Sequence, residues 1–517
     1  MPYAIDLFCG AGGFSEGILQ AGFDIIFSSD KSPMVQETYT NRHRQLGLIE
    51  GVDTHFELAD IKDVTSDYIF RTINSLKYGN IFAPKTIDAM FGGPPCQGFS
   101  RLGKRDSSDP RNMLFHEYLR LIRDIRPKYV VMENVTGILD MQMLDFPSVI
   151  GQVYNGQHLV PYILQNELEK LDYTVLEMKV LNAANFGVPQ QRNRAIFLAY
   201  RNDVPPINYP TSIDTNVTVY DALGDLYYEY MYSTDYSIKS MHGRTPMKNL
   251  NSTIKREKIT NMEISKHDIT VTERFSLYKE GENRKKALDR IKFEGIDLLE
   301  ETPDLFYETL FQINSTHNSK VIQETLKLYD SGAQINFSDR WLNNTNKQLS
   351  LILKYEKNID SRKLLKVSIL ALSRRIHLEY ETTLEFLNKI KPLLNKNISK
   401  KELQKRLLDG DIDSELANAL FTKKGIRTRL NSKKVAPTMV TLPDDYIHPY
   451  FNRILTVREM ARLQSFDDSF EFLGKRTTGG SKRALETPQF TQVGNAVPPL
   501  LAKAIAEEVL KAICSAK

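Results

Sequence analysis

The sequence predicts an α/β fold: a doubly wound, mostly parallel sheet joined to a second, largely helical domain. Over roughly the first 200 residues, short apolar runs alternate with amphipathic stretches, the pattern of strands separated by helical crossovers. After Thr215 the composition shifts toward Asn, Lys, Ile, Leu and Tyr, with apolar residues at helical spacing. With 517 residues, 41% of them hydrophobic, the chain can bury large cores, and its length favours two domains.

The amino-terminal residues predict a βαβ unit. Tyr3–Phe8 is an apolar run typical of a buried strand, Gly10–Gly13 predicts a tight turn, Phe14–Ala21 a helix and Asp24–Ser28 the next strand. The alternation continues, with strands expected at Ile87–Phe91, Tyr129–Met132 and Ala195–Ala199, and helices at Leu114–Ile125 and Val160–Leu171. This order predicts parallel strands with helices on both faces of the sheet.

Helical spacing recurs later in the chain, at Arg362–Leu394 and Lys400–Leu408. Two more helices are expected after Arg453, at Val457–Gln464 and at Pro498–Ala512, where proline fits the first helical turn.

The composition excludes several classes of protein. Every apolar run is broken by charge before the ~18 to 20 residues that a bilayer span requires, and no basic leader precedes an apolar segment, so we expect a soluble, cytoplasmic protein. Three cysteines, Cys9, Cys96 and Cys514, form no paired or metal-binding spacing. Their spacing favours a reducing compartment and no structural metal.

Positive charge is concentrated in the middle of the chain. The net charge is +4, yet residues 216–440 alone carry eight more basic than acidic residues. Phe421–Thr441 contains no acid and six cations, namely Lys423, Lys424, Arg427, Arg429, Lys433 and Lys434. This density is expected where a surface meets phosphates, although a solvated face would have the same composition.

A glycine-rich turn follows the first predicted strand. Asp6–Gly13 lies where strand passes into helix, and glycines there let backbone amides approach a ligand closely. Asp30 ends the second strand, at about the position from which a carboxylate can bind ribose hydroxyls. The spacing is not a full G-x-G-x-x-G, so a turn that merely packs helix on strand is the alternative.

Cys96 follows directly on an apolar strand. The segment Gly92–Ser100 surrounds it with two prolines and three glycines, which predicts a rigid turn at the carboxyl end of a strand, where open α/β sheets place their sites. We therefore expect Cys96 to be a nucleophile whose thiol pKa the site lowers. A small buried hydrophobe is the alternative interpretation.

Two further motifs are expected at the same edge of the sheet. Lys128–Val135 is a buried strand that carries Glu133 at its end, either facing the pocket of Cys96 or capping the next helix. Before the strand at Ala195, extended backbone would point three side chains into one space, those of Gln190, Arg192 and Arg194.

These blocks, in this order, resemble the DNA (cytosine-5) methyltransferase family, most simply a prokaryotic modification enzyme. The matching residues are the glycine turn, Pro94-Pro95-Cys96-Gln97, Glu133-Asn134-Val135 and Gln190-x-Arg192-x-Arg194, with Leu455–Phe466 and Gln492–Pro499 near the end of the chain. The resemblance covers about Ala4–Leu226 and Ala436–Val509. It implies an adenosylmethionine-dependent methyltransferase with a Rossmann-like sheet.

The resemblance implies four catalytic residues: Cys96, Glu133, Arg192 and Arg194. Cys96 would add to C6 of a cytosine flipped out of double-stranded DNA, making C5 nucleophilic toward the methyl group of S-adenosylmethionine. Glu133 would hydrogen-bond N3 and the exocyclic amine, Arg194 would contact O2, and Arg192 would support the same pocket.

The resemblance also implies the residues that hold S-adenosylmethionine. They are the turn residues Phe8, Gly10, Gly12 and Gly13, the acids Asp30 and Asp60, and Ile61, Pro94, Asn495, Ala496 and Val497. Residues 441–517 would then return to complete the cofactor pocket of the catalytic domain, residues 1–225.

Residues 226–440 would form the target-recognition domain, which reads DNA. Ser100–Arg111 resembles a mobile loop that closes over DNA and the flipped base. The residues expected at DNA are Gln97, Ser100, Arg101, Lys104, Arg105, Arg111, Lys423, Lys424, Arg427 and Arg429.

The resemblance predicts a monomer that binds double-stranded DNA and no membrane, in a restriction-modification or related defence system. A cognate restriction endonuclease or other defence proteins encoded alongside it are candidate partners. The alternatives are a cytosine-5 methyltransferase of tRNA, which the long basic insert disfavours, and a catalytically silent DNA-binding relative, which the intact catalytic residues disfavour. A nicotinamide oxidoreductase would explain the glycine turn but would leave Pro94-Pro95-Cys96 without a purpose.

Overall fold

The structure, a computed structural model, forms two compact units. It describes residues 1–95, 113–151, 153–213, 215–227, 233–248, 252–329, 335–356, 361–422, 427–479 and 485–515. The first unit contains residues 1–264, 431–443 and 455–517, and the second contains residues 265–430 and 444–454. Residues 226–264, expected in the target-recognition domain, thus belong to the first unit.

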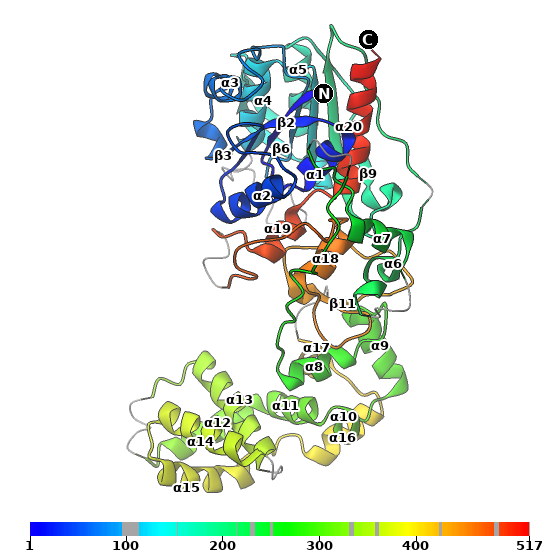
Figure 1. The fold of residues 1–517 in the computed structure, drawn as a ribbon. Coiled ribbons are helices and arrows are strands. Elements are labelled where there is room, and N and C mark those ends of the chain that lie inside the picture. Colours follow the sequence, from blue (N-terminus) through cyan, green and yellow to red (C-terminus); the bar gives the residue numbers. More distant parts are fainter. Residues whose placement is uncertain are drawn as a thin grey trace. The chain divides into compact units, whose positions relative to one another are not determined.

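The first unit is built on an eight-stranded sheet with the order β3-β2-β1-β4-β5-β10-β8, in which β9 also pairs with β10 (Figure 1). Strands β1 to β5 are parallel, whereas β10 runs antiparallel to β5, β8 and β9. Because β8, β9 and β10 follow one another without a helical crossover, antiparallel pairing is the available arrangement. The strands are β1 (Tyr3–Leu7), β2 (Asp24–Asp30), β3 (His55–Leu58), β4 (Ala89–Gly92), β5 (Tyr129–Asn134), β8 (Tyr173–Val175), β9 (Lys179–Asn182) and β10 (Asn193–Arg201).

Helices cover both faces of this sheet, as the sequence predicts. Successive strand residues enter opposite cores: Met90 and Met132 lie in one apolar cluster, and Phe91 and Val131 in the other. The first cluster includes side chains of α3 (Ser66–Asn74), α4 (Leu114–Ile125) and α5 (Val160–Glu169). The second includes side chains of α1 (Gly13–Ala21) and α20 (Pro499–Cys514). The predicted doubly wound, mostly parallel sheet is confirmed.

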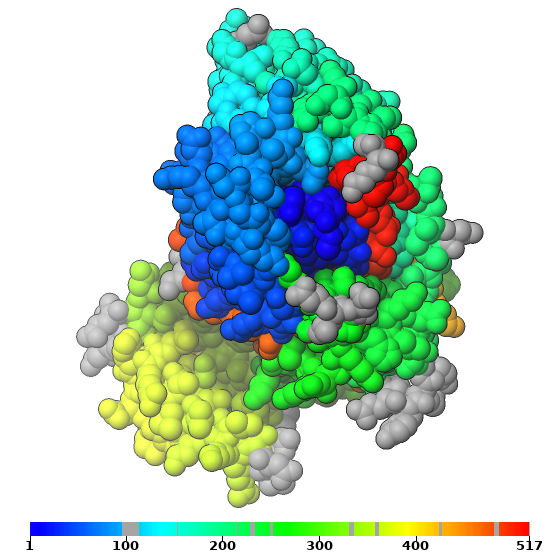
Figure 2. All heavy atoms as spheres, turned by 45° about the horizontal axis from the view of Figure 1, so that its top comes forward, coloured from blue at the N-terminus to red at the C-terminus, as the bar shows by residue number. Residues whose placement is uncertain are grey.

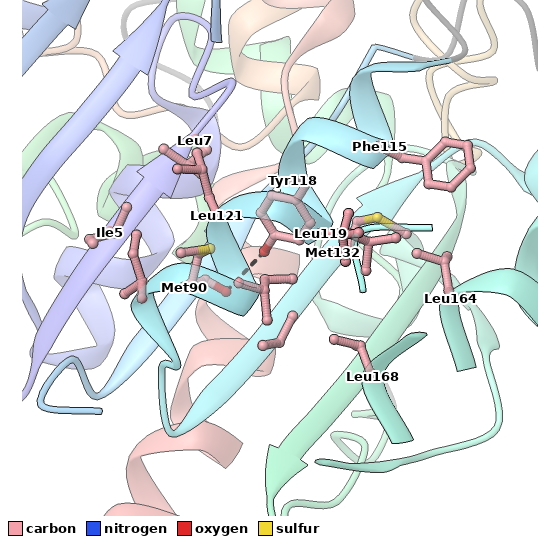
Figure 3. Close-up of a cluster of buried hydrophobic side chains, with 14 of the residues drawn as sticks. Ile5, Leu7, Met90, Phe115, Tyr118, Leu119, Leu121, Met132, Leu164 and Leu168 are labelled. Atoms are coloured by element: carbon pink, nitrogen blue, oxygen red, sulfur yellow. Dashed lines mark hydrogen bonds between the residues drawn. The ribbon is translucent and has the colours of Figure 1, made fainter. Parts of the chain in front are cut away.

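Tyr118 on α4 fixes the ends of two central strands. Its hydroxyl lies 3.1 Å from the carbonyl oxygen of Met90 on β4 (Figure 3) and 2.9 Å from that of Val131 on β5. Its ring lies so close to Gly92 that an added Cβ there would be 2.5 Å from it. Glycine at this position therefore lets α4 pack directly under the end of β4, where the segment toward Cys96 begins.

The remaining elements of the first unit surround this sheet. Its other helices are α2 (Pro33–Gln45), α6 (Val219–Leu223), α7 (Asp235–His242), α18 (Val457–Leu463) and α19 (Gln489–Asn495), with short 3-10 helices η1 (Ile61–Asp63), η3 (Thr136–Asp140), η4 (Ala183–Phe186) and η5 (Gly224–Leu226). A separate hairpin consists of β6 (Gln142–Pro147) and β7 (Val153–Leu159).

The second unit is mostly helical and has two apolar cores. One includes side chains of α8 (Ile269–Ser276), α9 (Arg284–Glu294), α10 (Leu298–Glu301), α11 (Pro303–Ile313), α16 (Lys400–Leu408) and α17 (Ser414–Phe421). The other includes side chains of α12 (Ser315–Leu326), α13 (Asp339–Tyr355), α14 (Arg362–Ile376) and α15 (Tyr380–Ile390). Two short strands pair in parallel, β11 (Thr428–Arg429) and β12 (Tyr446–Ile447). There are also two 3-10 helices, η8 (Lys391–Leu393) and η9 (Pro443–Asp445).

In the part of the chain that the structure describes, none of the helices combines the length and the apolar character needed to cross a membrane.

Candidate active site

The carboxyl ends of three central strands, β1, β4 and β5, lie at one edge of the sheet. The parallel register aligns Leu7 at the end of β1 with Gly92 at the end of β4, and Gly92 with Met132 on β5. The glycine turn, the Gly93-Pro94-Pro95 segment and Glu133 therefore emerge next to one another. This edge is where open parallel sheets bind their ligands.

The segment that leads to Cys96 is held against the end of β5. The side-chain amide of Asn134 donates to the carbonyl oxygen of Pro94 at 3.1 Å. An added Cβ on Gly93 would lie 3.4 Å from the Glu133 carboxylate, so this segment passes close to that acid. Cys96 and residues 97–112, which include six of the expected DNA contacts, lie outside the described residues.

Glu133 and Arg194 form an ion pair at this edge. Arg194 Nε lies 2.6 Å from Glu133 Oε1, and each side chain keeps 11% of its surface exposed. The antiparallel register of β5 and β10 places Glu133 opposite Ile196, two residues beyond Arg194. The pair thus offers a partly accessible carboxylate and guanidinium that can bind a polar ring by complementary hydrogen bonds.

Arg192 is 1% exposed, and its expected support of the pocket of Arg194 stays a prediction. Its guanidinium donates to the carbonyl oxygens of Met439 and Gly494, each at 2.9 Å. Gln190 shares the first of these partners: its Oε1 accepts from the amide of Met439 at 2.7 Å, and its side-chain amide donates to the carbonyl oxygen of Leu463 at 3.0 Å. Gln190 and Arg192 are buried whereas Gln191 and Asn193 are exposed, so side chains alternate in this segment.

The glycine turn adopts the backbone conformation that its sequence requires. Phe8 has φ 56°, which ends β1, and Gly10 and Gly12 have φ 54° and 96°, in the left-handed region that favours glycine. The amide of Gly10 donates to Asp30 Oδ2 at 3.2 Å, and the amide of Ser32 donates to Asp30 Oδ1 at 2.9 Å. Burial raises the pKa of Asp30 above its ordinary value. The turn and Asp30 are thus brought together.

Asp6, a buried acid, lies behind this turn. Ser15 Oγ donates to Asp6 Oδ2 at 2.5 Å, and Tyr39 connects Ser15 to Ser28 through hydroxyl contacts of 3.0 and 2.6 Å. Burial raises the pKa of Asp6 to about 7. Sequence reasoning missed this group, although an acid inside the otherwise apolar run Ala4–Leu7 is a signal for it.

The carboxyl-terminal segment closes on the same turn. An added Cβ on Gly13 would lie 2.3 Å from the carbonyl oxygen of Val497 and 3.0 Å from the Cβ of Ala496, and one on Gly17 would lie 2.4 Å from the Cβ of Ala502. In the ribbon, α20 runs beside α1, and the space-filling view shows the red carboxyl-terminal helix next to the dark-blue amino-terminal residues (Figures 1 and 2). Ala496 and Val497 are therefore at the turn, as expected, whereas Asn495 is exposed.

Of three other residues expected at the cofactor, Asp60 is exposed, whereas Ile61 and Pro94 are buried. The Asp60 carboxylate accepts from the amide of Lys62 at 3.1 Å and caps η1, while Ile61 is buried in the sheet core with α4. Pro94 is buried next to Asn134. Contacts of Asp60, Ile61 and Pro94 with S-adenosylmethionine therefore stay predictions.

Arg427 and Arg429 are buried, which counts against the expectation that they contact DNA. Arg427 is 7% exposed, and its Nε donates to the carbonyl oxygen of Asp444 at 3.0 Å. Arg429 is 6% exposed and donates to several carbonyl oxygens, including those of Tyr278 at 2.7 Å and Phe275 at 2.8 Å. Their guanidinium groups hold the second unit together instead. Lys423 and Lys424 lie outside the described residues.

Comparison with known proteins identifies the family of this chain. The family model described as C-5 cytosine-specific DNA methylase matches residues 3–511. The Type II methyltransferase M.DdeI of Desulfomicrobium norvegicum is 27% identical over 510 residues, covering 98% of this chain and 88% of that protein. M.XorII of Xanthomonas oryzae pv. oryzae is 36% identical over 226 residues, covering 44% of this chain and 46% of that protein.

One solved structure has a similar fold. It is described as a DNA modification methyltransferase encoded within a prophage (E. coli), and it matches with a TM-score of 0.54 at 19% identity, covering 99% of this chain and 100% of that one. At this identity the match supports the fold alone.

Proposed function

Since the chain belongs to the C-5 cytosine-specific DNA methylase family, and is thus a DNA cytosine-5 methyltransferase, we propose that it acts on a flipped cytosine through a transient bond to Cys96. The observation that carries the proposal is the ion pair of Glu133 and Arg194 beside the segment that leads to Cys96. This carboxylate and guanidinium, together with the thiol that comes next in the sequence after Pro95, can recognise cytosine and activate it.

The need for a covalent step follows from the electronics of the base. C5 of an aromatic pyrimidine is a poor nucleophile, and a bond from Cys96 Sγ to C6 converts the C5–C6 region into an enamine. C5 can then accept a methyl group. Loss of the C5 proton and cleavage of the Sγ–C6 bond restore the aromatic ring and the free thiol.

Glu133 and Arg194 have complementary roles in this scheme. Glu133 hydrogen-bonds N3 and the exocyclic amine, which stabilises the protonated base as sulfur adds. Arg194 donates to O2 and orients the Glu133 carboxylate, from which it lies 2.6 Å away. Thymine has a carbonyl oxygen at C4 in place of the amine, so an acceptor would face the Glu133 carboxylate, which would lose one of its donors, and thymine would be rejected.

The glycine turn suits S-adenosylmethionine, which supplies an electrophilic methyl group when bound. At Gly10 an added Cβ would meet nothing within 4 Å, so the turn has open space beside a backbone that can approach a ligand. Asp30, held at the turn by the Gly10 amide, is placed to accept from ribose hydroxyls. Phe8, Ala496 and Val497 would line the same site.

The biological setting is inferred from the relatives. Several are named Type II methyltransferases, among them M.DdeI and M.XorII. We infer that this chain modifies DNA in a restriction-modification system. The basic segment Ser100–Arg111 would close over the DNA at the flipped base.

Two measurements test the proposed function. Bisulfite sequencing of DNA from cells that express the chain should reveal 5-methylcytosine at a recurring sequence. Purified protein incubated with 5-fluorocytosine duplex and S-adenosylmethionine should form a stable crosslink, because fluorine at C5 cannot leave as the proton does. Methylation by Cys96→Ala, or crosslinking that persists in that variant, would contradict the covalent scheme.

A further inference from the structure

Helix α14 of the second unit presents a cationic face that its own fold does not use. The helix contains five cations and no acid: Arg362, Lys363, Lys366, Arg374 and Arg375. Among the residues that the structure describes, none of these cations forms an ion pair with an acid. Glu379, which precedes helix α15, and Glu381 in its first turn form no ion pair with these cations in the described part of the chain.

The opposite face of α14 packs into the apolar core of the second unit. Ile369, Leu372 and Ile376 are at most 4% exposed and belong to the core shared with α12, α13 and α15. The side-chain amide of Gln348 on α13 donates to the carbonyl oxygen of Ser368 at 3.0 Å. The orientation of α14 is therefore fixed, and Lys363, Lys366 and Arg374 are directed to solvent.

The helix dipole favours Arg374 and Arg375 in the last turn of α14, but it does not account for the cations in the first turns. Arg362 and Lys363 are the first two residues of α14, where the helix dipole disfavours positive charge. Arg362 and Lys366 are four residues apart, a spacing at which like charges destabilise a helix. No acid among the described residues offsets these two unfavourable charge interactions, whereas a bound polyanion would offset both.

An apolar row lies among the cations. Leu364, Val367 and Leu370 are 53%, 57% and 37% exposed. By themselves these side chains would suit a protein partner. The absence of any acid on the helix instead favours a polyanion that also offers less polar surface, as duplex DNA does with its phosphates and sugars.

We propose that α14 is a sequence-independent DNA-binding surface, in which Lys363, Lys366 and Arg374 bind phosphates of the duplex outside the catalytic site. From Lys363 to Arg374 the helix extends about 16 Å at 1.5 Å per residue, close to five steps of 3.4 Å along one DNA strand. The inference rests on the proposed function in that double-stranded DNA is the substrate. Phosphate contacts of this kind position the protein on the duplex and do not read its base sequence.

The test is the salt dependence of DNA binding by the full chain. The variant with Lys363→Gln, Lys366→Gln and Arg374→Gln should bind duplexes of any sequence more weakly than the wild type. The slope of log affinity against log salt should fall by about three, one for each phosphate that the variant no longer binds. Circular dichroism checks that the variant is folded.

A matched control changes the same charge where cations already have acidic neighbours. The exposed residues Lys320, Lys503 and Lys511 lie beside Glu324, Glu507 and Glu508 respectively. Replacing these three lysines by Gln should leave the salt slope unchanged. An equal fall in both triple variants would mean that net charge alone is responsible and would overturn the proposal.

Two other outcomes would also overturn it. One is an unchanged salt slope in the α14 variant while the wild type methylates DNA; this outcome rejects the surface and leaves the proposed function intact. The other is a wild-type dimer that Leu364→Gln with Val367→Gln dissociates in sedimentation without altering the salt slope, which would assign the face to a second copy of the chain. If the wild type forms no 5-methylcytosine, the proposed function fails, and the inference fails with it.

Discussion

Side-chain exposure separates the arginines of the catalytic unit into two kinds. Arg192, Arg458 and Arg462 are at most 1% exposed, and each binds backbone carbonyl oxygens or acids deep in the fold. Arg194 keeps 11% of its side chain exposed while it pairs with Glu133. A substrate ring can therefore reach the Glu133–Arg194 pair, whereas the enclosed arginines stabilise the protein.

Glu133→Gln should lower the rate of methyl transfer by about 10²- to 10⁴-fold, the usual contribution of a positioned acid–base group. Glutamine retains the size of the side chain but cannot carry the negative charge that pairs with protonated N3. Single-turnover kinetics with saturating DNA measure this rate. Glu169→Gln, at an exposed acid on α5, is the control, and equal rates for the two variants would contradict the role of Glu133.

Asp6 should make stability depend on pH. Burial raises its pKa from 3.8 to about 7, so between these values the folded protein retains a proton that the unfolded chain has lost. The free energy of unfolding should therefore fall as pH rises through this interval and level off above about pH 7. Asp6→Asn should remove this fall, which at about 1.4 kcal/mol per unit of pKa amounts to about 4 kcal/mol.

Urea unfolding at pH 5 and pH 8 measures the effect of Asp6. The control is Asp63→Asn, at an exposed carboxyl on η1. Parallel pH profiles for wild type and Asp6→Asn would show that Asp6 is not the group responsible.

At the scale of elements, α1 and α20 are in close contact at Gly17, which has no side chain. An added Cβ there would lie 2.4 Å from both the Cβ of Ala502 and the amide nitrogen of Lys503. Gly17→Ala should therefore destabilise the protein by about 1–3 kcal/mol, the usual cost of overpacking. Gly479→Ala, where an added Cβ meets nothing within 4 Å, is the matched control in thermal denaturation.

Local periodicity predicted the elements better than it predicted the side-chain partners. Apolar spacing identified α4 and α16 with the bounds that the structure has, because each helix buries one face. The partners of Arg192, Met439 and Gly494, could not be predicted because they lie far along the chain, and no local pattern encodes such contacts. Arg427 and Arg429 were assigned to DNA because a cluster of cations in sequence does not reveal which members are buried.

At the scale of the whole molecule, the chain passes between the two units four times. Residues 431–443 return to the first unit before residues 444–454 rejoin the second. Within the first unit this returning segment accepts from Arg192 at Met439, and its Ala436 exchanges backbone hydrogen bonds with Pro189 and Gln191. The second unit therefore cannot be excised as one continuous insert without removing part of the first.

Two deletions should have different effects. Removing residues 265–454 deletes the segment 431–443 and with it the contacts of Gln190 and Arg192 to Met439, so the remaining unit should lose cooperative unfolding. Removing only residues 265–430 and 444–454, with short linkers, should preserve folding and S-adenosylmethionine binding, measured by calorimetry. Equal stability of the two products would contradict this division of the chain.

The contact between Gly13 and Val497 has a consequence for synthesis on the ribosome. Residues up to Val497 must be synthesised, at a usual rate of about 5–20 residues per second, before the glycine turn at Gly13 is enclosed. A nascent chain could fold its central strands earlier but would have an open glycine turn until Val497 was made. Translation products that stop before Val497 would lack this enclosure, so we expect them to be unable to methylate DNA.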